Sequence, residues 1–350
     1  MSPVDPLLSV RGLRIAFGPV EAVRGLSFDV RDGEVLAIVG ESGAGKSLTA
    51  RAVLGMLPRG ATAAGSVRLR GEAELFPARR SVYAGLWGRR IALVPQDALA
   101  ALSPVHPVGD QLAAAVRSVR GVSRRQARVE AVAALERVGL PDAARRARAH
   151  PHEFSGGMRQ RAVIAMALIN EPELVVADEP TTALDPGTQR HVLELLTRRC
   201  EETGASLVLV THDLAAVKEY ARRMLVMYAG RAVESGPVDE VLARPHSPYT
   251  AGLLASLPPA APQPGSVRSG RTSRSGRRAG RRLPSIAGTP PMLAELPPGC
   301  AFAPRCPLAD DDDCRTQLPE PRRLGDAREV ACHHGGDLPD RPAELFLERS

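Results

Sequence analysis

The residue types and spacing needed to hold phosphate groups occur in one glycine-rich segment, Gly40-Glu-Ser-Gly-Ala-Gly-Lys46-Ser47. Glycines allow successive backbone N–H groups to converge on an anion, and the start of a following helix adds the positive end of its dipole. The lysine is placed to reach terminal phosphates, and the serine hydroxyl can bind Mg²⁺. This lysine is one of only two in the chain, which argues against a chance match. The residues predicted to bind a phosphate-bearing ligand are Gly40, Glu41, Ser42, Gly43, Ala44, Gly45, Lys46, Ser47 and Leu48.

Two consecutive carboxylates form a second chemical signal, at the end of the run Leu174-Val-Val-Ala-Asp178-Glu179. Ionised groups at the end of a buried strand need partners, because an unpaired buried charge is costly. The phosphate loop supplies such partners. Asp178 can hold Mg²⁺ through water, and Glu179 can polarise the water that attacks a γ-phosphate. Together the two motifs predict a P-loop nucleoside triphosphatase.

A third motif, Phe154-Ser-Gly-Gly-Met-Arg-Gln-Arg161, narrows the type of triphosphatase. It resembles the signature sequence of ATP-binding cassette (ABC) ATPases. In that family the signature cannot serve the phosphate loop of its own chain, so ATP lies between two subunits. The resemblance implies that ATP held by a partner subunit is gripped by Ser155, Gly156, Gly157 and Met158.

Other positions follow the order of the same family. Gln96 matches the glutamine loop, Asp185 the D-loop that crosses the dimer interface, and His212 the switch histidine at the γ-phosphate. Phe17 stands where the family places an aromatic ring against adenine. The resemblance implies a catalytic set of Glu179, His212 and Gln96, with Mg²⁺ bound by Ser47, Gln96 and Asp178.

Four longer segments resemble the ATP-binding subunits of bacterial oligopeptide and dipeptide importers. They span residues 149–161, 227–230, 246–254 and 296–307. The phosphate loop and the two residues after it look more like the first than the second of the two paired ATPases in such importers. The segment after Gln96 departs from the family, because Gln-Asp is followed by alanine instead of the usual proline.

The resemblance implies specific partners and a location. A second ABC ATPase subunit is expected, forming a heterodimer, together with two transmembrane permease subunits and an extracytoplasmic substrate-binding protein. The chain would then be peripheral, on the cytoplasmic face of the membrane, and would power peptide import. Its longest apolar run, residues 162–169, is much shorter than the ~20 residues that span a bilayer. Related importers carry nickel, glutathione or sugars, so the transported solute stays open.

The pattern of apolar residues predicts an α/β fold. The resemblance to ABC ATPases implies a mixed sheet core, an antiparallel β subdomain and a helical signature subdomain. Short β-branched runs at 35–39, 174–177 and 207–210 predict buried strands, and residues 110–149 and 186–203 predict helices. Residues 9–17 and 26–30 predict antiparallel strands. The predicted organisation is an ATPase domain over 1–257, a flexible linker over 258–284, a Cys-rich segment over 285–334 and a loose tail over 335–350.

Four of the five cysteines lie in the C-terminal segment, and clustered thiols in a cytoplasmic chain favour metal binding over disulfides. In the importer family this four-cysteine tail resembles one that holds a [4Fe–4S] cluster, for which four thiolates are the usual ligands. Zinc is the alternative, since it also accepts four thiolates. Cys200 stands apart in a predicted helix. The expected ligands are Cys300, Cys306, Cys314 and Cys332.

The net charge of +7 is a local property of the predicted linker. Seven arginines lie between residues 264 and 282 without an acid, and outside them the two charge signs balance. A specific nucleic-acid partner is therefore not expected. The main alternative is a soluble cassette ATPase that acts on DNA or ribosomes, but the chain has one cassette and no long insertion before the signature. A regulator that only binds ATP is opposed by the intact Glu179, Gln96 and His212.

Overall fold

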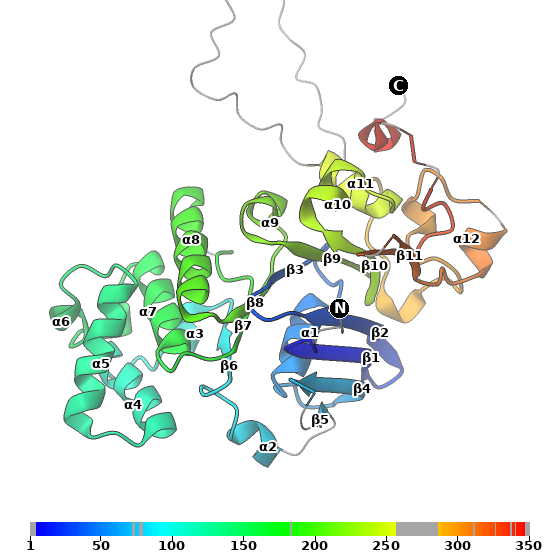
Figure 1. Cartoon of the computed structure of the whole chain (residues 1–350). Helices are drawn as coiled ribbons and strands as arrows, with labels where there is room; N and C mark the ends of the chain where they lie inside the picture. The colour runs from blue at the N-terminus through cyan, green and yellow to red at the C-terminus, as the bar shows by residue number, and fades with distance from the viewer. Residues whose placement is uncertain are drawn as a thin grey trace, which may run out of the picture.

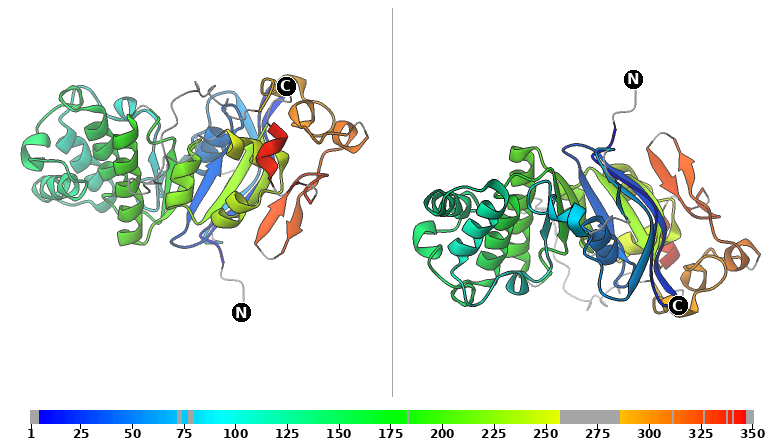
Figure 2. Two further views of the ribbon diagram at one scale, coloured as in Figure 1. Left: turned by 90° about the horizontal axis from the view of Figure 1, so that it is seen from above. Right: turned by 90° about the horizontal axis from the view of Figure 1, so that it is seen from below.

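The computed structural model describes residues 5–71, 74–76, 80–182, 184–256, 286–310, 312–325, 327–336, 338–339 and 341–346. The linker predicted over 258–284 lies outside the described residues. A helical lobe forms one end of the molecule, two sheets form the middle, and the Cys-rich segment lies at the other end (Figures 1 and 2).

The central sheet has eight strands in the order β11-β12-β10-β9-β3-β8-β7-β6. The run from β9 to β6 is parallel, whereas β10, β12 and β11 continue it in antiparallel fashion. All residues of β3, β7 and β8 are buried, as expected for strands covered on both faces. The three predicted strands are therefore confirmed. The strand bounds are β3 Val35–Val39, β6 Ile91–Val94, β7 Leu174–Asp178, β8 Ser206–Val210, β9 Arg223–Tyr228, β10 Arg231–Pro237, β11 Arg322–Leu324 and β12 Arg328–Val330.

A second, antiparallel sheet has the order β2-β1-β4-β5. It contains the predicted N-terminal strands, which the structure extends to β1 Leu8–Phe17 and β2 Val20–Val30, followed by β4 Ala61–Leu69 and β5 Glu74–Phe76. Helix α1 (Lys46–Val53) packs between this sheet and the central one, and apolar side chains of all three form one core cluster. Figure 1 shows α1 in that position. The start of α1 is thus held from both sides.

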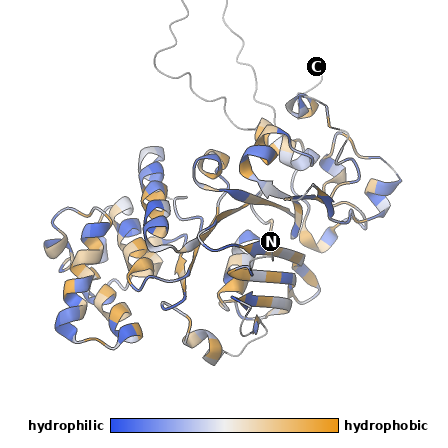
Figure 3. Ribbon diagram, viewed as in Figure 1, coloured by the Kyte–Doolittle hydropathy of each residue, from blue (hydrophilic) through white to orange (hydrophobic). Residues whose placement is uncertain are grey.

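The helical lobe contains the segment predicted to be helical over 110–149, which the structure divides into separate helices. Gly121 ends the first with a left-handed backbone, and the Ser123 hydroxyl caps the next by accepting a hydrogen bond from the Gln126 amide. Hydrophilic residues alternate with hydrophobic ones on these helices (Figure 3). The lobe contains α3 Ala98–Ala101, α4 Val108–Arg120, α5 Arg124–Arg137, α6 Ala143–Arg146, η1 Pro151–Glu153, α7 Gly156–Leu168 and α8 Pro186–Thr203. Helix α2 (Arg80–Ala84) lies apart from it (Figure 1), with Tyr83 packed in the core cluster that includes α1.

The C-terminal segment is joined to the central sheet. Strand β12 pairs with β10, with Val330 opposite Glu234, so the segment adds two strands to the sheet edge. Phe346, in the region expected to be a loose tail, is buried in the apolar cluster that includes α11. The expectation of a loose tail is corrected for this part, because its apolar side chains have a surface to cover. The remaining helices are α9 Leu214–Tyr220, α10 Val238–Ala243, α11 Pro248–Ala255, η2 Leu293–Glu295, η3 Ala303–Arg305, α12 Asp313–Thr316 and η4 Pro342–Phe346.

A buried ion pair secures this junction. Arg328 Nη2 of β12 lies 2.8 Å from Glu234 Oε1 of β10, and the two side chains are 9% and 1% exposed. The same guanidinium donates to the carbonyl of Arg244, and the Glu234 carboxylate accepts from the amides of His246 and Ser247. The pair therefore ties β12 to the start of α11.

Replacing Arg328 with leucine is expected to destabilise the full-length chain by about 3 kcal/mol, because Glu234 would keep a buried charge without its cation. The measurement is the free energy of unfolding in denaturant. The matched control is Arg323→Leu, since the Arg323–Glu329 pair is largely exposed and should contribute less than about 1 kcal/mol. Equal effects of the two substitutions would contradict a structural role for the buried pair.

Candidate nucleotide-binding site

The carboxyl ends of four neighbouring parallel strands carry most of the predicted site. The phosphate loop follows β3, His212 follows β8, Glu179 follows β7 and Gln96 follows β6. Ligands of open α/β sheets bind at this edge, because all the loops that leave it share one crevice. The strand order brings these sequence-distant residues to one side of the molecule.

At two positions of the phosphate loop, Gly40 and Gly45, the neighbouring backbone leaves no room for a side chain. A Cβ at Gly40, where φ is +150°, would lie 2.2 Å from the carbonyl oxygen of Met227. A Cβ at Gly45, where φ is +95°, would lie 2.8 Å from the carbonyl oxygen of Ala22. The loop is therefore pressed against β2 and β9, and its left-handed backbone turns directly into α1.

Lys46 is nearly fully buried, with 5% of the residue exposed. Its ammonium group donates to the carbonyls of Gly40 and Glu41 at 2.9 and 3.0 Å, and lies 3.9 Å from Glu179 Oε1. Burial lowers the pKa of Lys46, and the neighbouring carboxylates of Glu179, Asp178 and Glu41 oppose that shift. The cation is held by loop carbonyls at the place where the motif predicts phosphate.

Ser47 and Asp178 meet across the site. The Ser47 hydroxyl donates to Asp178 Oδ1 at 2.7 Å, and burial raises the pKa of Asp178. A buried carboxylate beside a hydroxyl is a donor set that suits Mg²⁺, which prefers hard oxygen ligands. The residues present therefore fit the predicted cation.

Glu179 adopts a left-handed backbone, with φ +46°, although it is not glycine. Its amide donates to the Val210 carbonyl, which fixes the strained turn against β8. Its carboxylate accepts from the Thr182 hydroxyl at 2.9 Å and lies 3.5 Å from Nδ1 of His212. The two predicted catalytic side chains are thus in direct contact, with His212 itself largely exposed.

The positions of Gln96 and Phe17 are set by β6 and β1, and within the described residues no side-chain hydrogen bond or ion pair joins either of them to this cluster. Gln96 is exposed two residues after β6, whose last residue, Val94, pairs with Ala177 of β7. Phe17 ends β1 opposite Val20 and is partly exposed. Both side chains are therefore accessible to solvent.

The signature residues belong to the helical lobe. The Ser155 hydroxyl caps α7 by accepting from the Met158 amide at 3.3 Å, and both Ser155 and Gly156 are exposed. A Cβ at Gly157 would lie 2.7 Å from the Thr188 side chain, at the start of α8. Asp185 caps that helix by accepting from the Thr188 amide. The signature and the D-loop aspartate therefore pack side by side, and no contact described here joins either to the phosphate loop.

Comparison with known proteins decides the family. A family model described as ABC transporter matches residues 23–182, and one described as oligopeptide/dipeptide transporter, C-terminal region, matches 233–279 and 274–314. The oligopeptide transport ATP-binding protein OppD of Mycobacterium tuberculosis is 46% identical over 94% of this chain. A putative peptide import ATP-binding protein of Brucella melitensis is 45% identical over 95% of this chain and 96% of its own length. The chain belongs to the family of peptide-transporter ABC ATP-binding proteins.

Further relatives agree on family and fold. DppD of Bacillus subtilis, a dipeptide transport ATP-binding protein, is 43% identical over 87% of this chain and 88% of its own length. The dimeric cassette MJ0796 bound to ADP and Pi aligns with a TM-score of 0.58 at 25% identity, over 66% of this chain and 98% of its own. The chain spans about half the length of the mycobacterial relatives, 52% of each. No helix in the described part of this family member has the length and apolar character needed to cross a bilayer.

The four C-terminal cysteines gather in one neighbourhood of this ABC protein. Burial raises the pKa of all four thiols, to about 11 at Cys306 and about 12 at Cys332. Neighbouring thiols raise the pKa further at Cys306, Cys314 and Cys332. Cys300 and Cys314 are also joined by a backbone hydrogen bond of 2.8 Å. Cys200, by contrast, is buried in α8 away from this group, as expected for a packing residue.

A second possible ligand group shares Cys314. Ligand atoms of Asp310, Cys314 and His334 lie within 4.8 Å of one another. The Asp310 carboxylate also accepts from the amides of Asp313 and Cys314, which lowers its pKa. Neither Asp310 nor His334 is among the ligands expected from the sequence, so this group was missed. Only the position of His334 two residues after Cys332 could have signalled it.

Sequence reasoning also missed the neighbours of Glu41. The Arg305 guanidinium of η3 forms an ion pair with the Glu41 carboxylate, and the Tyr249 hydroxyl accepts from the Glu41 amide. Arg305 lies in the Pro-Arg-Cys motif that carried the family resemblance, but nothing in its spacing pointed to the phosphate loop.

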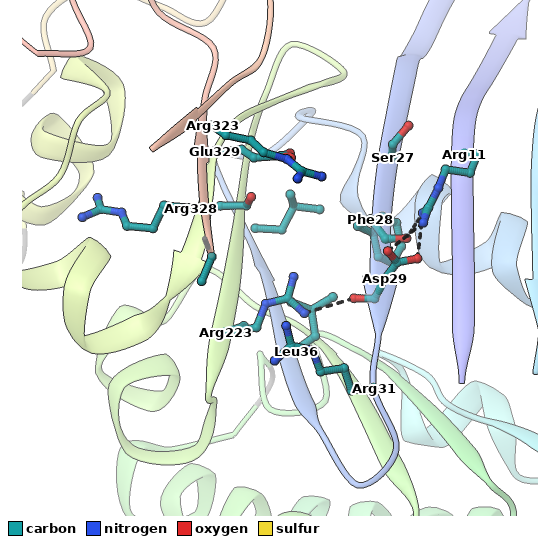
Figure 4. Close-up of a pocket in the computed structure, with 13 residues that line it drawn as sticks. Arg11, Ser27, Phe28, Asp29, Arg31, Leu36, Arg223, Arg323, Arg328 and Glu329 are labelled. Carbon is teal, nitrogen blue, oxygen red and sulfur yellow. Dashed lines mark hydrogen bonds and ion pairs between the residues drawn. The ribbon is translucent and has the colours of Figure 1, made fainter. Parts of the chain in front are cut away.

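An arginine-lined cleft of about 290 Å³ lies elsewhere, between β2 and the β11–β12 hairpin (Figure 4). It contains none of the motif residues. Its guanidinium groups are largely paired: Arg11 with Asp29, Arg223 with Glu34 and Arg323 with Glu329. The cleft is therefore a neutralised junction between subdomains and is distinct from the nucleotide site.

Replacing Asp178 with asparagine is expected to weaken Mg²⁺ binding without lowering the stability of the nucleotide-free chain. A carboxyl whose pKa is raised on folding destabilises the folded state at neutral pH, where it is ionised, so the nucleotide-free variant should be as stable as the parent or more so. The gain in ATP affinity produced by Mg²⁺ should fall about 10- to 100-fold. Thermal unfolding and ATP titration with and without Mg²⁺ measure the two effects.

The control is Asp32→Asn, which removes half of an exposed ion pair with Arg70. It should leave the Mg²⁺ dependence unchanged. An Asp178→Asn variant that unfolds earlier yet keeps its Mg²⁺ response would show that the carboxylate is structural.

Proposed function

We propose that this chain is the ATP-hydrolysing subunit that powers the import of oligopeptides or dipeptides through partner permease subunits. The observation that supports it most strongly is the cluster of Lys46, Ser47, Asp178, Glu179 and His212 at one edge of the sheet. The names of the relatives, which describe oligopeptide and dipeptide transport, support the choice of substrate class.

The roles proposed for the side chains follow from their positions. Lys46 leaves its loop carbonyls to bind the β- and γ-phosphate oxygens of ATP. Ser47 and Asp178, together with Gln96, would hold Mg²⁺, which supplies neutralising charge to the phosphates. Glu179 accepts the proton of the attacking water, and the neighbouring His212 orients the carboxylate and contacts the γ-phosphate. Phe17 stacks on the adenine ring.

Two copies of the cassette are needed to complete each ATP site in this proposal. The signature residues Ser155–Met158 and the D-loop residue Asp185 lie together in the helical lobe. Ser155, Gly156 and Asp185 are exposed and Gly157 and Met158 partly so, which suits a surface that closes on a second subunit. We infer a heterodimer with a paired ATPase, two membrane permeases and an extracytoplasmic binding protein. The chain would be peripheral to the cytoplasmic face of the membrane, with residues 1–257 as the ATPase domain.

We also propose that Cys300, Cys306, Cys314 and Cys332 hold a [4Fe–4S] cluster. Their shared neighbourhood and their burial suit four thiolate ligands whose charges a metal would offset. Zinc is the alternative, and the group of Asp310, Cys314 and His334 offers it a mixed ligand set. The role proposed for the metal is structural or regulatory.

Two substitutions test the ATPase proposal. Glu179→Gln should keep ATP binding but reduce hydrolysis by about 10²–10⁴-fold, because the general base is lost while the phosphate loop is intact. Lys46→Ala should weaken ATP binding itself. Both are measured by ATP titration and phosphate release in the assembled transporter, and near-parental turnover of Glu179→Gln would overturn the assigned role.

Metal analysis tests the cluster. Protein purified without oxygen should contain about four irons per chain and absorb broadly in the visible. Cys332→Ser should lower the iron content, whereas Cys200→Ala, a buried thiol outside the group, should leave it unchanged. One zinc per chain without iron would replace the cluster proposal and leave the ATPase proposal, which depends on other residues, intact.

A further inference from the structure

Arg305 of the Cys-rich segment contacts the phosphate loop. Arg305 lies in η3, between Cys300 and Cys306, and binds Glu41 with both terminal nitrogens: Nη1 to Oε2 at 2.7 Å and Nη2 to Oε1 at 3.0 Å. The Arg305 side chain is 6% exposed and that of Glu41 24%. Paired contacts of this kind fix the relative orientation of the two groups as well as their separation.

The position of Arg305 is fixed by the segment and by β9. Its Nε donates to the Ala287 carbonyl and its Nη1 to the Tyr228 hydroxyl. The backbone around it is a tight turn, in which the Arg305 amide donates to Phe302 and the Cys306 amide to Ala303. The turn between the two cysteines therefore sets the position of the Arg305 backbone, and the bonds to Ala287 and Tyr228 hold its guanidinium toward Glu41.

Glu41 in turn is held at three points. Its carboxylate binds Arg305, its amide donates to the Tyr249 hydroxyl at 2.8 Å, and its carbonyl accepts from the Lys46 ammonium at 3.0 Å. The rings of Tyr228, Tyr249 and Phe302 pack under this group, with centroids 4.5–5.3 Å apart. The second residue of the phosphate loop is thus anchored to the C-terminal segment and to the phosphate-binding lysine at once.

Because Glu41 is negatively charged, its pairing with Arg305 affects the binding of an anionic ligand. An uncompensated carboxylate in the phosphate loop would repel a triphosphate, and a guanidinium paired with it removes that repulsion. A lysine could supply the charge but not the two parallel hydrogen bonds, so the shape of the loop would be less well defined.

We propose that Arg305 is a positioning residue for ATP: it acts through Glu41 to hold the phosphate loop in its binding shape, so that nucleotide affinity depends on the folded turn between Cys300 and Cys306. The inference rests on the proposed binding of ATP at this loop. It gives the Cys-rich segment a role in setting the affinity of the site.

The test is a double-mutant cycle in the full-length chain, with the dissociation constant of ATP measured by calorimetry. Arg305→Gln should weaken ATP binding about tenfold, because Glu41 is left unpaired beside the phosphates. Glu41→Gln should weaken it only about twofold, and the double variant should match Glu41→Gln, so that the second substitution rescues the first. Arg305→Lys should fall between the parent and Arg305→Gln.

The matched control is Arg323→Gln, which changes a paired arginine of the same segment outside the loop and should leave affinity unchanged. Thermal unfolding and metal content of each variant are measured alongside. Additive losses in the double variant, or parental affinity in Arg305→Gln, would overturn the proposal, because a merely structural arginine gives no rescue. If the parent chain fails to bind ATP, the proposed function fails instead, which the Lys46→Ala comparison reports separately.

Discussion

The burial of Lys46 beside Asp178 and Glu179 is the constraint on which the rest of the structure depends. These groups must stay charged to serve a polyphosphate, yet the sheet edge that holds them excludes most water. Each has a polar partner: loop carbonyls for the lysine, Thr182 for Glu179 and, from a distant segment, the Ser47 hydroxyl for Asp178. The parallel sheet, in which β3, β8 and β7 are adjacent, brings the phosphate loop and the two carboxylates to one edge.

The same constraint explains where the backbone is strained. Gly40 and Glu179 both adopt positive φ at the ends of fully buried strands. Strands covered on both faces by apolar clusters are rigid enough to hold such turns, which in an exposed loop would relax. The two sheets and α1 are therefore the support of the site as well as the bulk of the core.

The sequence was most informative where chemistry is local. The phosphate loop, the strand before it and the 186–203 helix could be predicted because glycines, apolar runs and caps act over a few residues. Contacts between distant segments could not: no local pattern relates Glu41 to Arg305, or places Asp310 beside His334. The packed residues near Phe346 were missed for the same reason, since their apolar character has meaning only against α11.

The C-terminal segment is attached to the sheet by two arginines whose surroundings differ. Arg328 meets Glu234 in a nearly closed environment and joins β12 to β10. Arg305 meets a partly exposed carboxylate in the loop that would hold phosphate. The negative charge of a bound triphosphate would act on the Arg305–Glu41 pair, whose carboxylate belongs to the phosphate loop. Because coupling between two sites is reciprocal, a segment that sets nucleotide affinity must itself be stabilised when nucleotide binds. Binding of nucleotide at the phosphate loop would therefore stabilise the turn around Arg305, although none of the motif residues of that loop belongs to the Cys-rich segment.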